Sequence, residues 1–176
     1  MEPGGGAVRV RPWAPTDTEA TRHILLETWR ATYGPFVPDA DLTAFLDSAY
    51  AADRMAGLHC DDPPRALRRA FIADVGGVAV GYLRLSRAEG PVCDIHSLYV
   101  LPQFQKKGVG RALLNEAVCF ARGLRCEALR LSVMSANRAA IEWYRREGFT
   151  VDTAATADFW IGRTRIDVVA ATRALS

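Results

Sequence analysis

Hydrophobic and polar positions alternate along several short stretches of the chain, a pattern typical of strands that bury one face. The alternation predicts strands at residues 8–11, 70–75, 78–85, 93–100, 128–134, 151–161 and 164–170. Apolar residues at a helical spacing predict helices at residues 16–32, after Pro38, at 108–122 and at 138–147. This order of elements predicts an α/β (α+β) fold, in which a mixed, mostly antiparallel, twisted sheet of about seven strands is flanked by about four helices.

Turn and capping residues mark several boundaries between these elements. Gly76-Gly77 lies between two apolar runs and predicts a tight hairpin. Thr16-x-x-Glu19 has the spacing of a capping box at the start of the first helix. Asn137 is a suitable N-cap for the last helix, which Gly148 ends.

Length and composition favour one globular domain. The chain has 176 residues, of which 49% are apolar, so we expect a single domain over 7–176 after a flexible lead at 1–6. The net charge of +2 is too small to indicate nucleic acid or an anionic membrane as a partner. No apolar run approaches the ~20 residues that span a bilayer, and no secretion signal is recognisable, so we expect a cytoplasmic protein.

The cysteines do not form a metal-binding pattern. None of them belongs to a CxxC pair, and His59-Cys60 has no second ligand pair nearby at zinc spacing. We therefore expect no metal and reduced thiols at Cys60, Cys93, Cys119 and Cys126.

Charge is distributed unevenly along the chain. The stretch 38–62 holds six acids and one base, whereas 103–148 holds nine bases and four acids. An acidic first half and a basic second half suit a cationic substrate and an anionic cofactor. Two ordinary solvated faces would give the same pattern.

A predicted strand runs into a glycine-containing loop that opens a helix, at residues 97–111. The first amides of a helix are unpaired and lie at the positive end of its dipole, so such a terminus can bind phosphate. Gly108 and Gly110 would let a ligand approach the backbone, and Lys106, Lys107 and Arg111 add positive charge. Neither the P-loop pattern nor G-x-G-x-x-G is present. An ordinary glycine-containing helix start remains the alternative.

Two motifs at this point resemble one protein family. Gln105-x-x-Gly108-x-Gly110 is similar to the [QR]-x-x-G-x-[GA] pyrophosphate loop of the GNAT superfamily of N-acetyltransferases. The segment from Asn137 to Phe149 is similar to that family's N-x-x-A-x-x-[FW]-Y-x-x-x-G-F segment. The resemblance extends from Val8 to about Ala170.

The resemblance implies acetyl-CoA as cosubstrate and direct attack by an amine in a ternary complex, without an acyl-enzyme. Acetyl-CoA would lie where the strand of Leu98–Val100 splays from that of Leu129–Met134. Backbone groups near Leu98, Tyr99 and Val100 would bind the pantetheine arm and polarise the thioester carbonyl, and Asn137 would also contact the arm. The pyrophosphate would be held by Gln105, Lys106, Lys107, Gly108, Val109, Gly110 and Arg111.

The resemblance also nominates catalytic residues. Tyr144 is the candidate general acid, because a neutral phenol can protonate the departing thiolate; a core aromatic beside Trp143 is the alternative. Asp94, His96 and Leu98 share one strand face by period-2 alternation. Asp94 lies eleven residues before Gln105, where histone-type members carry a glutamate. His96 has the better unperturbed pKa for a base, and water alone is the third candidate.

Trp29-x-x-x-Tyr33 resembles a segment that borders the acceptor pocket in a broad bacterial branch of the family. The rings could hold an ammonium group by cation–π contact, or could be an i, i+4 packing pair. With the acidic stretch, this favours a small cationic amine as acceptor. A protein lysine or N-terminal acetyltransferase and a non-catalytic acyl-CoA sensor are the alternatives, and many family members form homodimers.

Overall fold

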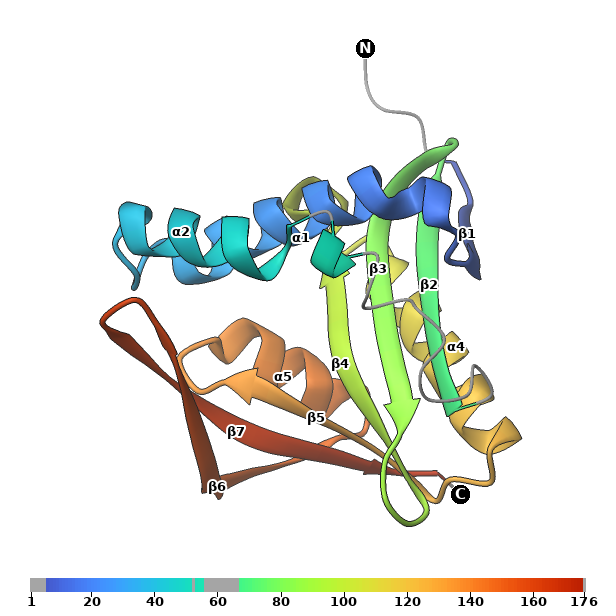
Figure 1. Ribbon diagram of the computed structural model, residues 1–176. Coiled ribbons are helices and arrows are strands. Elements are labelled where there is room, and N and C mark those ends of the chain that lie inside the picture. Colours follow the sequence, from blue (N-terminus) through green and yellow to red (C-terminus); the bar gives the residue numbers. More distant parts are fainter. Residues whose placement is uncertain (1–5, 52, 56–66, 176) are drawn as a thin grey trace.

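The computed structural model describes residues 6–51, 53–55 and 67–175 (Figure 1). Its strands form one seven-stranded sheet in the order β1-β2-β3-β4-β5-β7-β6. Their bounds are β1 Val8–Pro12, β2 Arg68–Val75, β3 Val78–Arg87, β4 Val92–Val100, β5 Ala128–Met134, β6 Thr150–Ile161 and β7 Thr164–Ala174. All neighbours are antiparallel except β4 and β5, so the predicted mixed, mostly antiparallel sheet is confirmed.

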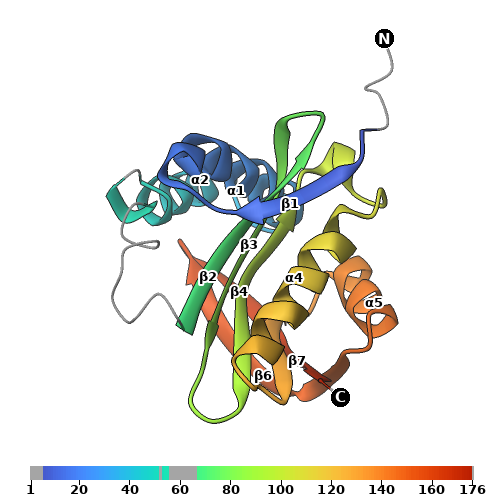
Figure 2. The same cartoon turned by 90° about the vertical axis from the view of Figure 1, so that its right-hand side faces the viewer.

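Helices cover both faces of the sheet (Figure 2). Helix α1 (Thr18–Tyr33) lies against β3 and β4 on one face and contacts α2 (Asp39–Ala49). Helix α4 (Val109–Gly123) lies on the other face against β1–β5, and α5 (Arg138–Arg146) packs on β6. The main core joins α1, α4 and the sheet, and it buries Leu83, Leu113 and Leu129 completely. Burial of these apolar side chains fixes α4 on the strands that carry the site.

The hairpin between β2 and β3 forms as predicted. Gly76 and Gly77 both have positive φ, 60° and 81°, which a tight two-residue turn requires and which glycine adopts without a steric penalty. The last strand is longer than expected, because β7 continues past residue 170 to Ala174 and stays paired with β5.

The predicted capping box at Thr16 is wrong. A 3-10 turn at Pro15–Asp17 comes first, and α1 begins at Thr18 without a side-chain cap. The carboxylate of Asp17 accepts hydrogen bonds from the Ala14 N–H at 2.8 Å and from both terminal nitrogens of Arg11 at 2.7 and 2.8 Å. The ion pair with β1 therefore determines how the chain enters α1.

Some expectations fall outside the described residues. These include the lead at 1–5, the His59-Cys60 pair and the acids Asp61 and Asp62. Among the residues that are described, no three His, Cys, Asp or Glu side chains form a group that could hold a metal. In the same part of the chain, no helix is both long and apolar enough to cross a bilayer.

The Arg11–Asp17 pair makes stability depend on pH. The hydrogen bonds from Arg11 hold the pKa of the largely buried Asp17 below its ordinary value of 3.8. A lowered folded-state pKa stabilises the protein fully above the unfolded value, and this contribution is lost as the pH falls through the folded value. We expect Asp17→Asn to lower the free energy of unfolding at pH 7 by about 1–3 kcal/mol, and the difference from wild type to shrink in acid. Urea unfolding at several pH values measures both.

Glu27→Gln is the matched control. Glu27 and Arg30 are both about half exposed and 3.9 Å apart, so removing this pair should cost less than about 1 kcal/mol. A deficit in Asp17→Asn that stays constant down to pH 2 would contradict the account of Asp17.

Candidate functional site

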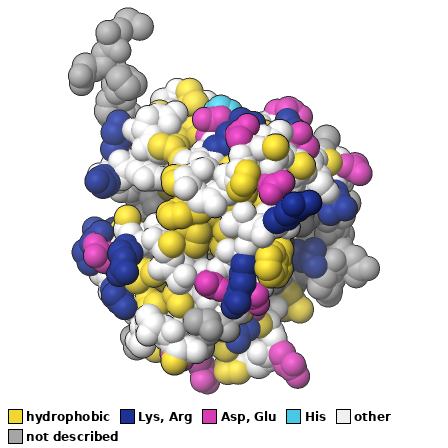
Figure 3. All heavy atoms as spheres, turned by 90° about the vertical axis from the view of Figure 1, so that its left-hand side faces the viewer, with side chains coloured by type: hydrophobic (Ala, Val, Ile, Leu, Met, Phe, Trp, Pro, Cys, Tyr) yellow, Lys and Arg dark blue, Asp and Glu magenta, His cyan; other side chains and the backbone are white. Residues whose placement is uncertain are grey.

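The site is the opening between β4 and β5. The two strands pair over three positions only, from Val92 with Ala128 to Asp94 with Arg130. Beyond that point they diverge, and the edges of Ile95–Val100 and Leu131–Met134 no longer face each other as a ladder (Figure 1). On the side toward which they open, hydrophobic side chains gather across the middle of the surface, with Lys and Arg beside them (Figure 3). The predicted splay of these strands is therefore present.

A β-bulge shapes β4 inside this opening. Arg84 of β3 is paired with Ser97, whereas the next residue, Leu85, is paired with Ile95, so His96 is the extra residue. The bulge corrects the expectation that Asp94, His96 and Leu98 share a face. Leu98 is opposite the buried Leu83 and packs in the core below α4, whereas His96 and Asp94 lie on the α1 face.

The free edge of β4 presents backbone groups to the opening. Leu101 N–H donates to Val80 O at 2.9 Å, and groups of successive residues point to opposite sides of a strand. Val100 and Leu98 therefore direct their backbone groups away from β3, toward the opening. The Gln105 side-chain amide donates to Val100 O at 3.1 Å, which ties the following loop to this edge.

The loop after β4 ends in an exposed helix terminus. Gly108 is the N-cap of α4 with φ 84°, and Lys106 also has positive φ, 60°. Ala112 N–H donates to Gly108 O at 3.0 Å, which places the amides of Val109, Gly110 and Arg111 in the first turn, before the intrahelical ladder begins. An anion such as a pyrophosphate suits this terminus.

The two sequence motifs are in contact. A Cβ placed on Gly110 would come within 3.2 Å of the Trp143 ring, so the small residue lets α5 approach the start of α4. Arg111 makes a two-pronged ion pair with Glu147, with Nη2–Oε1 at 2.8 Å and Nε–Oε1 at 3.1 Å. The Arg111 charge expected at the phosphate is thus engaged by Glu147.

Helix α5 places Tyr144 beside the opening. Asn137 caps the helix as predicted, its Oδ1 accepting from Ala140 N–H at 3.1 Å. Tyr144 is buried against Trp143 and Phe149. Burial raises its pKa, and Tyr99 of β4 adds to this effect, so the two phenols lie within electrostatic reach of each other. Both stay protonated at neutral pH, since burial also raises the pKa of Tyr99 to about 12.

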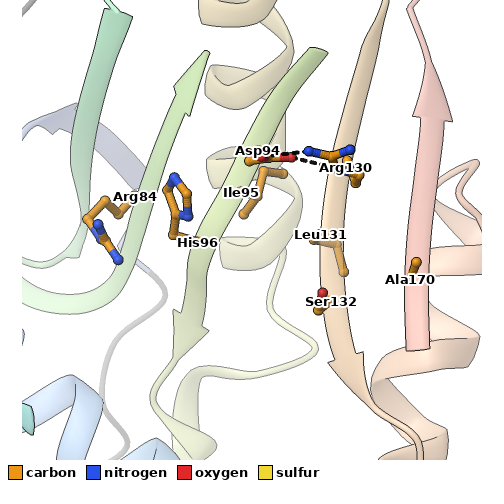
Figure 4. Close-up of a pocket in the computed structure, with 8 residues that line it drawn as sticks. All are labelled: Arg84, Asp94, Ile95, His96, Arg130, Leu131, Ser132 and Ala170. Atoms are coloured by element: carbon orange, nitrogen blue, oxygen red, sulfur yellow. Dashed lines mark hydrogen bonds and ion pairs between the residues drawn. The ribbon is translucent and has the colours of Figure 1, made fainter. Parts of the chain in front are cut away.

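A cavity of about 460 Å³ lies at the apex of the opening, where β4 leaves β5 (Figure 4). Charged and polar side chains from β3, β4 and β5 and apolar side chains from β4, β5 and β7 line it, namely Arg84, Asp94, Ile95, His96, Arg130, Leu131, Ser132 and Ala170. The close-up shows Arg84 beside His96 and Asp94 joined to Arg130.

Asp94 is held by Arg130. Its carboxylate accepts from Arg130 Nε at 2.7 Å and from Nη2 at 2.9 Å, so both oxygens are occupied. The pair joins β4 to β5 at the last paired position.

The surroundings of His96 differ from those of Asp94. Its Nε2 is 2.7 Å from Ser86 Oγ, and part of the ring reaches solvent. The surrounding protein atoms lower its pKa below 6.5, and the positive charge of Arg84 lowers it further. His96 is therefore neutral at pH 7, the form that can accept a proton.

One family model matches most of this architecture. The Acetyltransferase (GNAT) family model covers residues 19–149. The chain belongs to this family. The computed structure superposes on the PaiA N-acetyltransferase from Thermoplasma acidophilum, solved in complex with coenzyme A, with a TM-score of 0.79 at 17% identity over 96% of this chain and 99% of that one. At this identity the likeness shows a shared fold.

Curated relatives differ in how much of their own length this chain covers. The N-alpha-acetyltransferase RimI of Mycobacterium tuberculosis is 35% identical over 117 residues, which are 58% of this chain and 72% of RimI. A spermidine N(1)-acetyltransferase of T. acidophilum is 21% identical over 87% of this chain and 94% of its own length. The chain spans only 38% of an N-acetyltransferase of Methanocaldococcus jannaschii and 26% of a mycothiol acetyltransferase of Propionibacterium freudenreichii.

The aromatic pair of this GNAT protein lies in a closed cluster. Trp29 and Tyr33 are each 8% exposed, with ring centroids 4.6 Å apart, and Phe45 stacks on Trp29 at 5.1 Å. Trp29 and Tyr33 therefore pack against each other as an i, i+4 pair. Their buried ring faces leave little surface for an ammonium group. The indole N–H of Trp29 is buried near the Tyr99 hydroxyl, without a hydrogen bond of normal geometry in the described chain.

Sequence reasoning missed several residues that line the cavity. Arg84, Arg130 and Ser132 each alternate with apolar neighbours, which is typical of an ordinary solvated strand face. The signal that could have found Arg84 is a lone charge within the apolar run 78–85. Its link to His96 depends on strand register, which the sequence leaves open.

Proposed function

We propose that this GNAT protein transfers an acetyl group from acetyl-CoA to a primary amine by direct attack in a ternary complex. The observation that carries the proposal is the opening between β4 and β5, bordered by an anion-binding helix terminus, a free strand edge and a buried phenol. These groups come from distant parts of the chain, and packing between Gly110 and Trp143 joins them.

The residues present fit acetyl-CoA. The first-turn amides of α4, from Val109 to Arg111, would hold the pyrophosphate. Lys106 and Lys107 would add charge, although Lys107 also lies 5.4 Å from the Phe104 ring centroid. The Leu98–Val100 edge would pair with the pantetheine amides, and one of its N–H groups would polarise the thioester carbonyl. Acetyl-CoA supplies an acetyl group whose carbonyl carbon the amine attacks.

The acceptor must lose a proton to attack, because an alkylammonium has a pKa near ~10. His96 is our candidate for the group that takes this proton. It is neutral at pH 7, lines the apex cavity and has an imidazole edge in solvent. Asp94 is the second candidate, but its two oxygens are occupied by Arg130. In our proposal the ion pair instead fixes the distance between β4 and β5.

Tyr144 is our candidate for the group that protonates the departing thiolate. Its raised pKa keeps the proton on the phenol until negative charge develops beside it. The neighbouring Tyr99 is also neutral and can donate a hydrogen bond to the same charge. The four cysteines have no part in this scheme, and Cys93 is fully buried with its pKa raised by burial.

The relatives support two classes of acceptor. A small cationic amine is supported by the spermidine acetyltransferase among the relatives, and a protein N-terminus by RimI. However, none of the described acids expected to attract a cation, Asp39, Asp41, Asp47 and Asp53, belongs to the cavity lining, and Asp39, Asp47 and Asp53 are exposed. A non-catalytic acyl-CoA sensor is the alternative from another class, and the placement of His96 and Tyr144 counts against it.

Replacing Tyr144 tests its proposed role as the general acid. Tyr144→Phe should lower kcat for CoA release about 10²–10⁴-fold, because the thiolate leaves without a proton donor. The affinity for acetyl-CoA should change little, since the ring remains packed against Phe149. Tyr82→Phe, which removes another buried hydroxyl, should keep kcat within a few-fold of wild type. A Tyr144→Phe enzyme with normal kcat would exclude this role.

Replacing His96 tests its proposed role as the general base. A general base must be neutral, so wild-type kcat/KM should fall as the pH drops through the lowered pKa of His96, below 6.5. His96→Gln should lower kcat about 10²-fold or more and remove this acid limb. His23→Gln, at an exposed position on α1, is the control and should keep both rate and profile. If His96→Gln retains the wild-type profile, water or Asp94 is the base.

A further inference from the structure

Arg84 is a charged side chain in the lining of the apex cavity, and it has no carboxylate partner in the part of the chain that the structure describes. It lies on β3 between the buried Leu83 and Leu85 and is itself half-buried. It lines the same cavity as His96, and their side chains lie next to each other on adjacent strands (Figure 4). Among the described residues no carboxylate forms an ion pair with it, whereas Arg11, Arg111 and Arg130 each have at least one carboxylate partner.

The charges in the cavity do not balance. Among the described residues that line the cavity, Asp94 is the one carboxylate, and its oxygens are both bound by Arg130. His96 is neutral at pH 7 and is pushed further toward the neutral form by Arg84. The lining therefore carries one positive charge in excess, located on Arg84. A partly desolvated guanidinium is costly without a partner, so the cavity favours a ligand that brings an anion.

The anion is not the one expected from acetyl-CoA. The pyrophosphate site is the start of α4, which begins beyond the C-terminal end of β4. Arg84 is opposite Ser97 in the middle of β4 and on the face toward α1, whereas α4 covers the other face. The hydroxyls of Ser86 and Ser132 are polar groups of the same region, and Ser86 already contacts His96.

We propose that the acceptor is an amine that also bears a carboxylate, which Arg84 binds while the amine faces His96. The proposal rests on the acetyl-transfer function proposed above. The planar guanidinium can donate two parallel hydrogen bonds to a carboxylate, a geometry that fixes the orientation of the acceptor. An α-amino acid or a related amino carboxylate fits this charge pattern. A polyamine does not, because its second cation would meet Arg84.

The test is a matched panel of acceptors bound to the CoA-saturated protein. Each amino acid is compared by calorimetry with its amide and with its decarboxylated amine, which keep the amine and remove the negative charge. Wild type should bind the carboxylate member roughly 10-fold or more tightly than the other two. Arg84→Gln should bring all three within about threefold of each other, and Arg84→Lys should restore part of the preference.

Arg9→Gln is the control for loss of one positive charge. Arg9 is exposed on β1, outside the cavity lining, so this variant should keep the wild-type preference. Thermal unfolding of Arg84→Gln shows whether the variant is folded. If wild type binds the amide or the decarboxylated amine as tightly as the carboxylate, if Arg84→Gln keeps the preference, or if no member binds at millimolar concentration, the proposal is wrong.

Measuring CoA release beside binding separates this proposal from the proposed function. A carboxylate preference that depends on Arg84, without turnover of any amine, would retain the anion site and overturn the transferase. Turnover of amines without any carboxylate preference would retain the transferase and overturn the role of Arg84.

Discussion

The site depends on the short parallel pairing of β4 and β5. Three paired positions are enough to align the strands, and the Asp94–Arg130 ion pair closes the last of them. Beyond this point each strand keeps its antiparallel partner on one edge, β3 for β4 and β7 for β5. The facing edges are thereby left without a strand partner. Full pairing would satisfy the backbone but would leave no opening.

The other features of the site follow from this geometry. The bulge at His96 turns a side chain of β4 into the apex cavity and sends Leu98 into the core. Contact between Gly110 and Trp143 holds the start of α4 against α5, so the first turn of α4 and Tyr144 border the same opening. The residues that border the opening lie on β4 and β5, in the first turn of α4 and on α5.

Much of this was predictable from the residues. The hydrophobic pattern predicted the order of the elements, and motif resemblance placed the loop, Asn137 and Tyr144. The pairing register was not predictable, because one bulged residue changes which side chains share a face, and alternation alone put Leu98 with Asp94 and His96. For the same reason the cavity partners Arg84 and Arg130 were missed. The capping box failed because Asp17 binds an arginine from β1, a contact between elements that local spacing does not report.

In the function proposed for this protein, the opening between β4 and β5 receives the cosubstrate. Amide hydrogen exchange, resolved to single residues with and without saturating coenzyme A, tests it most directly. Exchange should slow at the Leu98–Val100 edge and in the first turn of α4, from Val109 to Arg111, while the outer strand β1 stays unchanged. Coenzyme A that binds, by calorimetry, yet leaves those amides unprotected and slows exchange elsewhere would contradict the account.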